Sequence, residues 1–255
     1  MSSTNISERF ARIQSDVDKI GGFLATLNIA VWDAFLGYQE SICTAGHLME
    51  IGVYKGKSAA ILAHHQRAGE QLWLVDSSHF IDEARANIGH LSPHEIRYLK
   101  QKSVDLHRNT ELSSLCRSYR WIHIDGEHTG QALATDLALA HTLLADDGVI
   151  CIDDFFNPAY PQVAAATFSF LHSHPFDLTL FACGHNKGYL ARPTYARHFS
   201  LMIRSSLAAE LRQRGFSEFT LFKTSSADDY NCWGICQRFG DRDYYGLDAN
   251  PDEFH

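Results

Sequence analysis

Apolar positions along the first 45 residues follow a helical spacing, in steps of three and four. This spacing predicts amphipathic helices over residues 5–45, with one apolar stripe facing a core. Gly21 and Gly22 interrupt the stretch and predict a break into two helices. The stripe consists of Phe10, Ile13, Val17, Ile20, Leu24 and Leu27.

From about residue 46 to 192, short runs of apolar and β-branched residues alternate with helical patterns. Strands are expected at Leu48–Gly52, Leu72–Asp76, Ile96–Leu99, Trp121–Asp125, Val149–Asp153, Leu178–Ala182 and Lys187–Ala191. Helices are clearest at Ser58–Arg67, Gly130–Leu144 and Gln162–His172. This alternation predicts an α/β fold with a doubly wound, mostly parallel, seven-stranded Rossmann-like sheet. Only four residues separate the last two strands, which predicts an antiparallel hairpin at one edge.

Beyond residue 192 the pattern predicts a helix over about Tyr195–Arg214, then apolar runs at Phe219–Phe222 and Trp233–Cys236. A polar tail containing Tyr244–Tyr245 and Asp248–Asp252 follows, and it either orders over a substrate or stays mobile. We expect a single domain with three parts. These are a helical segment (1–45), a core (46–192) and a C-terminal extension (193–255).

Composition narrows the class of protein. The chain has 255 residues, is 45% hydrophobic and carries a formal net charge of −8. One substantial core is expected, and the negative charge argues against a general nucleic-acid binder. No apolar run is long enough for a membrane span, and the first residues lack the layout of a signal peptide. Six scattered cysteines without zinc-ribbon spacing suggest free thiols in a reducing cytoplasm.

Acidic residues end two of the expected strands. Asp125 follows Trp121–Ile124, and Asp153 and Asp154 follow Val149–Ile152. Because ligands of open α/β sheets bind outside the carboxyl ends of the strands, these three carboxylates are expected to meet. Such a cluster repels itself unless a cation neutralises it, and carboxylate oxygens suit Mg²⁺ or Ca²⁺. The alternative is that Asp153 and Asp154 cap a helix or open a loop.

The first strand leads into a glycine-containing loop that reads Glu50-Ile-Gly52-Val-Tyr54-Lys-Gly56-Lys-Ser58. Glycines there allow the backbone to approach a ligand closely. The Gly-x-Gly-x-x-Gly fingerprint of dinucleotide binding is absent, which argues against an NAD-dependent oxidoreductase. Asp76 ends the second strand, where an acid accepts hydrogen bonds from ribose hydroxyls or caps a helix. Ser103, after the third strand, would lie near an adenine ring.

These residues together resemble the class I S-adenosylmethionine-dependent methyltransferases. More narrowly, they resemble the metal-dependent O-methyltransferases, which include catechol O-methyltransferase and the macrocin-type sugar O-methyltransferases. The resemblance covers roughly residues 46–192. It implies that Asp125, Asp153 and Asp154 bind Mg²⁺. It also implies a set of residues that contact S-adenosylmethionine, namely Glu50, Gly52, Tyr54, Gly56, Ser58, Asp76, Ser103 and Asp125.

Two departures from the catechol enzymes favour a sugar or another aliphatic hydroxyl as acceptor. The third metal ligand of the catechol enzymes is an asparagine, whereas Asp154 is an acid, as in the sugar enzymes. Their general base is a lysine three residues beyond the first metal ligand, whereas this chain has His128 there, again more like the sugar enzymes. His123, two residues before Asp125 on the same side of the strand, is expected to be a core residue.

The chemistry can also be built from the residues. An aliphatic hydroxyl does not ionise at neutral pH, so a metal would polarise it while Asp125 helps to bind that metal. His128 would remove the proton, since its ordinary pKa of ~6.5 leaves it mostly neutral at pH 7. The partner is then a hydroxylated small molecule. A catechol or phenol acceptor, and a non-catalytic S-adenosylmethionine-binding module, are the alternatives.

The apolar stripe of residues 5–45 has two alternative uses. The two N-terminal helices would either close over the cofactor as a lid or form a contact between copies of the chain.

Overall fold

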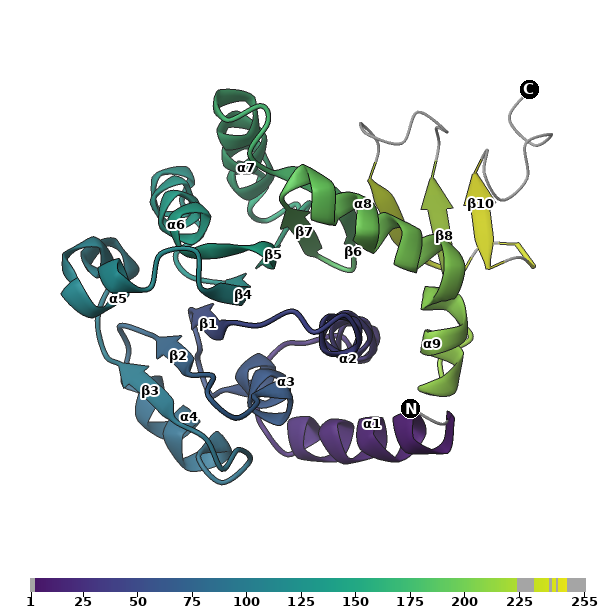
Figure 1. Ribbon diagram of the computed structural model, residues 1–255, viewed down its shortest axis with the longest axis horizontal. Helices are drawn as coiled ribbons and strands as arrows, with labels where there is room; N and C mark the ends of the chain where they lie inside the picture. The colour runs from purple at the N-terminus through teal and green to yellow at the C-terminus, as the bar shows by residue number, and fades with distance from the viewer. Residues whose placement is uncertain (1–2, 224–231, 239, 242, 247–255) are drawn as a thin grey trace.

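The computed structural model describes residues 3–223, 232–238, 240–241 and 243–246 (Figure 1). Its helices are α1 (Ser3–Asp18), α2 (Thr26–Ser41), α3 (Lys57–His65), α4 (Phe80–Ile88), η1 (Ser103–Arg108), α5 (Thr110–Ser114), α6 (Gly130–Leu143), α7 (Pro161–Ser173), α8 (Pro193–Met202), η2 (Ile203–Leu207) and α9 (Ala208–Gln213). Its strands are β1 (His47–Ile51), β2 (Leu72–Val75), β3 (Ile96–Leu99), β4 (Tyr119–Ile124), β5 (Leu144–Ile152), β6 (Thr179–Gly184), β7 (Lys187–Ala191), β8 (Phe219–Lys223), β9 (Trp233–Gln237) and β10 (Tyr244–Gly246).

All these strands belong to one sheet, in the order β10-β8-β9-β6-β7-β5-β4-β1-β2-β3. The strands from β3 to β5 run parallel, and β7 runs antiparallel to both of its neighbours. The central strands β1, β2 and β4 are buried almost throughout, as expected for parallel strands with both faces covered. The α/β class and the mostly parallel sheet predicted from the sequence are confirmed.

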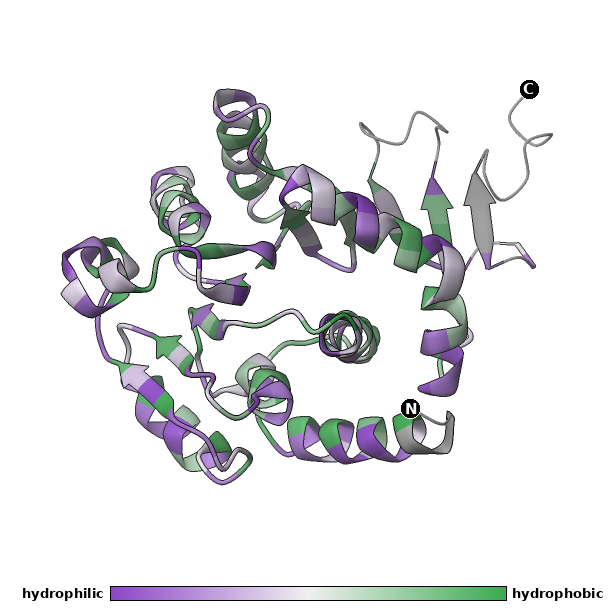
Figure 2. Cartoon of the chain, viewed as in Figure 1, coloured by the Kyte–Doolittle hydropathy of each residue, from purple (hydrophilic) through white to green (hydrophobic). Residues whose placement is uncertain are grey.

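Two hydrophobic cores lie on opposite faces of this sheet. One joins residues of α1–α4, α8 and α9 to the sheet, and the other joins residues of α6 and α7 to the opposite face. Figure 1 shows α2 end-on within the curve of the sheet, and α1 lies farther from the sheet than α2. In Figure 2 the apolar side of α1 faces inward and its polar side faces outward. Helix α1 therefore has the amphipathic orientation that its sequence spacing predicts.

The N-terminal helices are part of the folded core. Phe10, Ile13, Val17 and Ile20 of the apolar stripe are at most 5% exposed, so this chain buries the stripe itself. Helix α2 is buried along most of its length. The stripe is therefore not exposed for the second of the two alternative uses, a contact between copies of the chain. The connection between α1 and α2, together with Asn28 of α2, borders the large cavity described below.

The predicted seven-stranded sheet with a hairpin at its edge was wrong in extent. Strands β6 and β7 do pair antiparallel, but β6 also pairs with β9, and β8 and β10 extend the sheet further. The physical reason is that the free backbone groups of β6 are paired by strands from the C-terminal extension. Asp248–Asp252 of the expected polar tail lies outside the described residues. In the part of the chain that is described, no helix has the length and apolarity to cross a membrane.

Candidate active site

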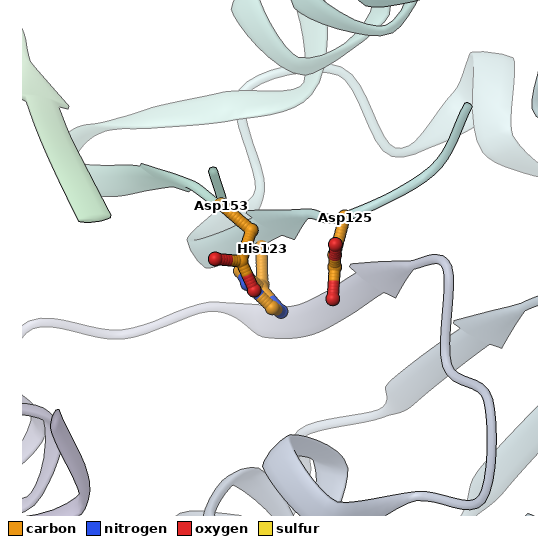
Figure 3. Close-up of side chains that lie close together, drawn as sticks. All are labelled: His123, Asp125 and Asp153. Atoms are coloured by element: carbon orange, nitrogen blue, oxygen red, sulfur yellow. The ribbon is translucent and has the colours of Figure 1, made fainter. Parts of the chain in front are cut away.

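Strands β4 and β5 bring three carboxylates to one place. The strands pair in parallel up to Ile124 and Ile152, so Asp125 and Asp153 leave the sheet side by side. Figure 3 shows Asp125, Asp153 and His123 converging. Ligand atoms of these three residues lie within 4.8 Å of one another, and the same holds for Asp125, His128 and Asp154. The predicted convergence of the three aspartates is therefore present in the structure.

His128 lies among these carboxylates. Its Nε2 is 2.9 Å from Oδ2 of Asp154 and 3.4 Å from Oδ1 of Asp125. The ring stacks on Tyr160 with centroids 4.3 Å apart, and Gln162 Nε2 donates to the His128 carbonyl at 2.6 Å. Contact with Asp125, reinforced by the other aspartates, raises the pKa of His128. The expectation of an ordinary histidine pKa is therefore not met in this state of the site.

The electrostatics differ between the two neighbouring aspartates. Burial raises the pKa of Asp125 to about 6, and the nearby charge of Asp153 adds to the effect. Burial also acts on Asp153, but His123 and the Lys187 ammonium outweigh it and hold the pKa of Asp153 well below its usual range. Lys187 Nζ donates to Asp153 Oδ2 and is itself buried. Asp153 thus contacts a lysine, whereas Asp125 contacts no lysine or arginine among the described residues.

Beneath the carboxylates, Glu50 and His123 form a fully buried pair. Oε1 of Glu50 accepts from Ser58 Oγ and lies 3.1 Å from His123 Nδ1. Burial lowers the pKa of His123, but contacts with Asp153 and Glu50 outweigh this and raise it to about 9. Oε2 of Glu50 is buried without a hydrogen-bond partner. His123 is a core residue, as predicted, and it also connects Glu50 to the aspartates.

The loop after β1 requires its first glycine. Gly52 has φ +84°, and a Cβ there would lie 1.8 Å from the Asp125 carbonyl oxygen. Asp76 holds the loop from the other side, since its Oδ2 accepts from the backbone N–H groups of Val53 and Tyr54 at 3.0 and 2.8 Å. The close approach of β1 and β4 therefore leaves no room for a side chain at position 52.

A cavity of about 590 Å³ opens above these loops. Residues of the glycine loop and the three carboxylates all line this cavity, so it connects the loop to the carboxylates. Among the predicted site residues, those that line it are Gly52, Tyr54, Ser58, Asp76, Asp125, His128, Asp153 and Asp154.

Three predicted cofactor residues lie elsewhere. Glu50 is under the cavity floor, where it holds Ser58. Gly56 allows α3 to pack closely on α4, because its Cβ would meet Ile88 and Ala84 at 3.2 and 3.3 Å. Ser103 borders a separate cavity of about 360 Å³ between η1 and α6.

Sequence reasoning missed several residues of the cavity, Lys187 above all. Lys187 begins β7, directly after a tight turn in which His185 and Asn186 have positive φ. Asn28 Nδ2 of α2 donates to the His185 carbonyl at 2.9 Å, which fixes this turn against the N-terminal helices. The only signal in the sequence was a lysine directly before an apolar run, which usually marks a solvent-exposed strand end.

Comparison with known proteins extends these observations. Residues 49–155, which include the glycine loop, Asp76 and all three carboxylates, match a family described as a methyltransferase domain. Residues 49–155 are similar to a methyltransferase domain. The resemblance stated from the sequence is thereby confirmed at the level of the domain, and the match ends directly after Asp154.

Solved structures share the fold of this methyltransferase domain. The alignment with the O-methyltransferase NovP covers 66% of this chain and 80% of NovP, with 15% identity and a TM-score of 0.51. The alignment with cofactor-bound Rv0187 from MTB covers 72% of this chain and 88% of that protein, with 16% identity and a TM-score of 0.53. The alignment with the O-methyltransferase from Bacillus cereus in complex with SAH covers 73% of this chain and 89% of that protein, with 17% identity and a TM-score of 0.50. A search of curated proteins finds no relative by sequence.

The residues of the methyltransferase domain fit a divalent cation. Asp153 pairs with Lys187, whereas Asp125 and Asp154 contact no lysine or arginine among the described residues. Burial raises the pKa of Asp125, and the nearby charge of Asp153 adds to the effect. An oxygen-rich, negatively charged cluster of this kind suits Mg²⁺.

Proposed function

We propose that this protein is an S-adenosylmethionine- and Mg²⁺-dependent O-methyltransferase that acts on a hydroxyl of a sugar or glycosylated small metabolite. One observation carries the proposal. Asp125, Asp153, Asp154 and His128 converge on the same cavity as the glycine loop and Asp76. A methyl donor at the loop and an acceptor at the carboxylates would therefore be adjacent.

The glycine loop and Asp76 make up the cofactor side of the proposed site. Gly52 and Asp76 line the cavity, and the Asp76 carboxylate, at the end of β2, would accept from ribose hydroxyls. Asp76 also holds two loop amides, so ribose binding and loop order would be linked. The B. cereus O-methyltransferase binds SAH, which supports the same cofactor in this fold.

The acceptor side would combine binding with proton removal. Mg²⁺, when bound by Asp125, Asp153 and Asp154, would supply a Lewis acid that polarises the acceptor hydroxyl. Nε2 of His128 faces the same aspartates and would take the proton as the new O–C bond forms. Tyr160 holds the imidazole ring by stacking, and Gln162 holds its backbone, so the base has a fixed position.

Aromatic side chains near the carboxylates suit a ring-shaped acceptor. Phe23 and Tyr160 line the cavity and are exposed, Phe23 fully. Phe156, two residues after Asp154, is also exposed. Aromatic faces pack on sugar rings and on phenols alike, so the preference for a sugar rests on His128 and Asp154. A catechol or phenol acceptor is the second candidate.

A methyl-transfer assay tests the proposal. Purified protein is incubated with methyl-labelled S-adenosylmethionine and a panel of glycosides and catechols, with Mg²⁺ or with EDTA. We expect label transfer to a hydroxyl of a glycoside that EDTA abolishes and added Mg²⁺ restores. Metal-independent transfer would reject the metal role. If SAH does not bind, measured by calorimetry with NAD⁺ as control, the cofactor assignment is wrong.

A further inference from the structure

Strands β6 and β9 bring two thiols together at a distance from the carboxylates. Sγ of Cys183 lies 3.5 Å from Sγ of Cys232, and both side chains are partly buried. The two residues are far apart in sequence and meet because β9 pairs with β6. Of the other cysteines, Cys43 and Cys116 are exposed, Cys151 is buried, and Cys236 is partly buried like the pair.

The strand register explains the contact. Cys183 is paired with Gly234, and residues paired across a sheet face the same side. Cys232 precedes Gly234 by two positions and shares its face, and Gly234 has no side chain to separate the thiols. Cys236, two positions beyond Gly234, is on that face as well and is the natural comparison residue.

The two thiols differ in acidity. The hydrogen bond with Cys183 lowers the pKa of Cys232, and the positive charge of Lys223 contributes in the same direction. The same hydrogen bond, together with burial, raises the pKa of Cys183. Since the thiolate is the reactive form, Cys232 is the nucleophile of the pair and Cys183 is the proton donor.

We propose that Cys183 and Cys232 are a modification site at which a peroxide closes a reversible disulfide between β6 and β9. The Cys232 thiolate attacks one peroxide oxygen, the O–O bond breaks, and Cys232 becomes a sulfenic acid. Hydroxide leaves and takes the Cys183 proton to form water. The Cys183 thiolate then attacks the Cys232 sulfur and expels hydroxide, which takes from solvent the proton that Cys232 released on ionising and becomes a second water. Hydrogen peroxide is reduced by two electrons, and the two thiols supply them.

Closure requires a small movement. The sulfur atoms must approach by about 1.5 Å to reach the ~2.05 Å of a disulfide bond. Cys232 lies just before the first residue of β9, so the strand ladder does not hold its own backbone in place. Cys183 leads through Gly184 into the turn of His185 and Asn186, which borders the cavity. The bond would therefore tie the strand that precedes this turn to β9.

The test is mass spectrometry on the full chain. Reduced protein is treated with a small molar excess of hydrogen peroxide, free thiols are alkylated, and intact mass and non-reduced peptides are measured. We expect a loss of two alkylatable thiols and one linked peptide pair, Cys183 with Cys232, both reversed by dithiothreitol. In Cys183→Ser the reaction should stop at a sulfenic acid on Cys232, which dimedone traps.

Cys236→Ser is the matched control, and it should form the linked pair as the unmodified chain does. Circular dichroism of each variant verifies that it is folded, and peroxide treatment in denaturant should remove the selectivity. The proposal is overturned if Cys183 and Cys232 both remain fully alkylatable while the protein is folded. It is equally overturned if Cys232 links to Cys236, or if peroxide adds only oxygen without pairing thiols.

Discussion

Asp33 and Asp125 are carboxylates of the same chain with opposite electrostatic environments. Arg214 Nε donates to Oδ2 of Asp33 at 2.6 Å, and His65 Nε2 lies 2.8 Å from Oδ1 of Asp33. Burial disfavours the Asp33 charge, but these partners outweigh it and hold its pKa far below the usual range. Asp125 has no lysine or arginine in contact among the described residues, and its pKa rises to about 6.

The difference separates a structural cluster from a functional one. Around Asp33, arginines pair with the acid and connect α1, α2 and the residue that follows α9. Around Asp125, one lysine pairs with Asp153 alone, and Asp125 itself lines a cavity. Folding therefore completes the first cluster, whereas under the proposed function a bound cation would complete the second.

The largest effect is expected for activity when the unmatched carboxylate is removed. Asp125→Asn should lower kcat/KM for methyl transfer by at least about 10³-fold, because a metal contributes several kcal/mol at about 1.4 kcal/mol per tenfold. Urea unfolding should show the same or a higher stability, since an unfavourable charge is gone. A strongly destabilised Asp125→Asn protein would contradict the comparison.

The same substitution at the matched carboxylate should have the opposite result. Asp33→Asn removes the buried carboxylate that pairs with Arg214 and leaves this arginine with Glu210 alone, so we expect the free energy of unfolding to fall by about 3–5 kcal/mol. Urea unfolding monitored by circular dichroism measures it. Asp18→Asn, at an exposed position of α1, is the control and should leave stability unchanged. An equally small effect at both positions would refute the structural role of Asp33.

A smaller loss of rate is expected for the base. His128→Gln should lower kcat by about 10²-fold, at the lower end of general-base contributions, while SAH affinity is retained. His172→Gln, on the exposed side of α7, is the matched control. Steady-state kinetics together with SAH calorimetry separates the two effects. If only KM changes, His128 binds the acceptor and does not act as the base.

The smallest effect concerns acid stability of the matched cluster. Burial opposes the charge of Glu40, but contacts with His65 and Arg9 lower its pKa to about 2. Because this folded value lies below the unfolded value of ~4.3, the stabilisation is complete above pH 5 and disappears as the pH falls towards 2. After allowance for partial exposure, we expect about 1–2 kcal/mol.

Denaturant unfolding of the wild-type chain and Glu40→Gln at pH 7, 5 and 3 tests this expectation. The stability difference between them should shrink between pH 5 and pH 3. A difference that stays constant with pH would show that the Glu40 charge does not contribute.

Local sequence patterns predicted the parts of the fold that depend on local physics. The strand predictions for Ile96–Leu99 and Lys187–Ala191 match β3 and β7 at both ends, because turn residues bound these runs. The place of the β6–β7 hairpin inside the sheet was not predictable, since it depends on pairing with β9, about 50 residues further along the chain. Periodicity reports which face of a strand is buried, and it does not report the partner strand.

The site was predictable to the same extent. Acids at strand ends follow from sheet geometry, so Asp125, Asp153 and Asp154 were found together with His128. Lys187 was not found, because its contact with Asp153 depends on β7 lying antiparallel beside β5. Ser103, expected near an adenine ring, lines a separate cavity, because η1 positions it against α6.

Binding of Mg²⁺ to the SAH-saturated protein tests the central claim most directly. In isothermal titration calorimetry, we predict one Mg²⁺ per wild-type chain, loss of that binding in Asp125→Asn, and retention in His172→Gln. An absence of Mg²⁺ binding by the wild-type protein, or unchanged binding in Asp125→Asn, would contradict the claim that the unmatched carboxylates hold a catalytic cation.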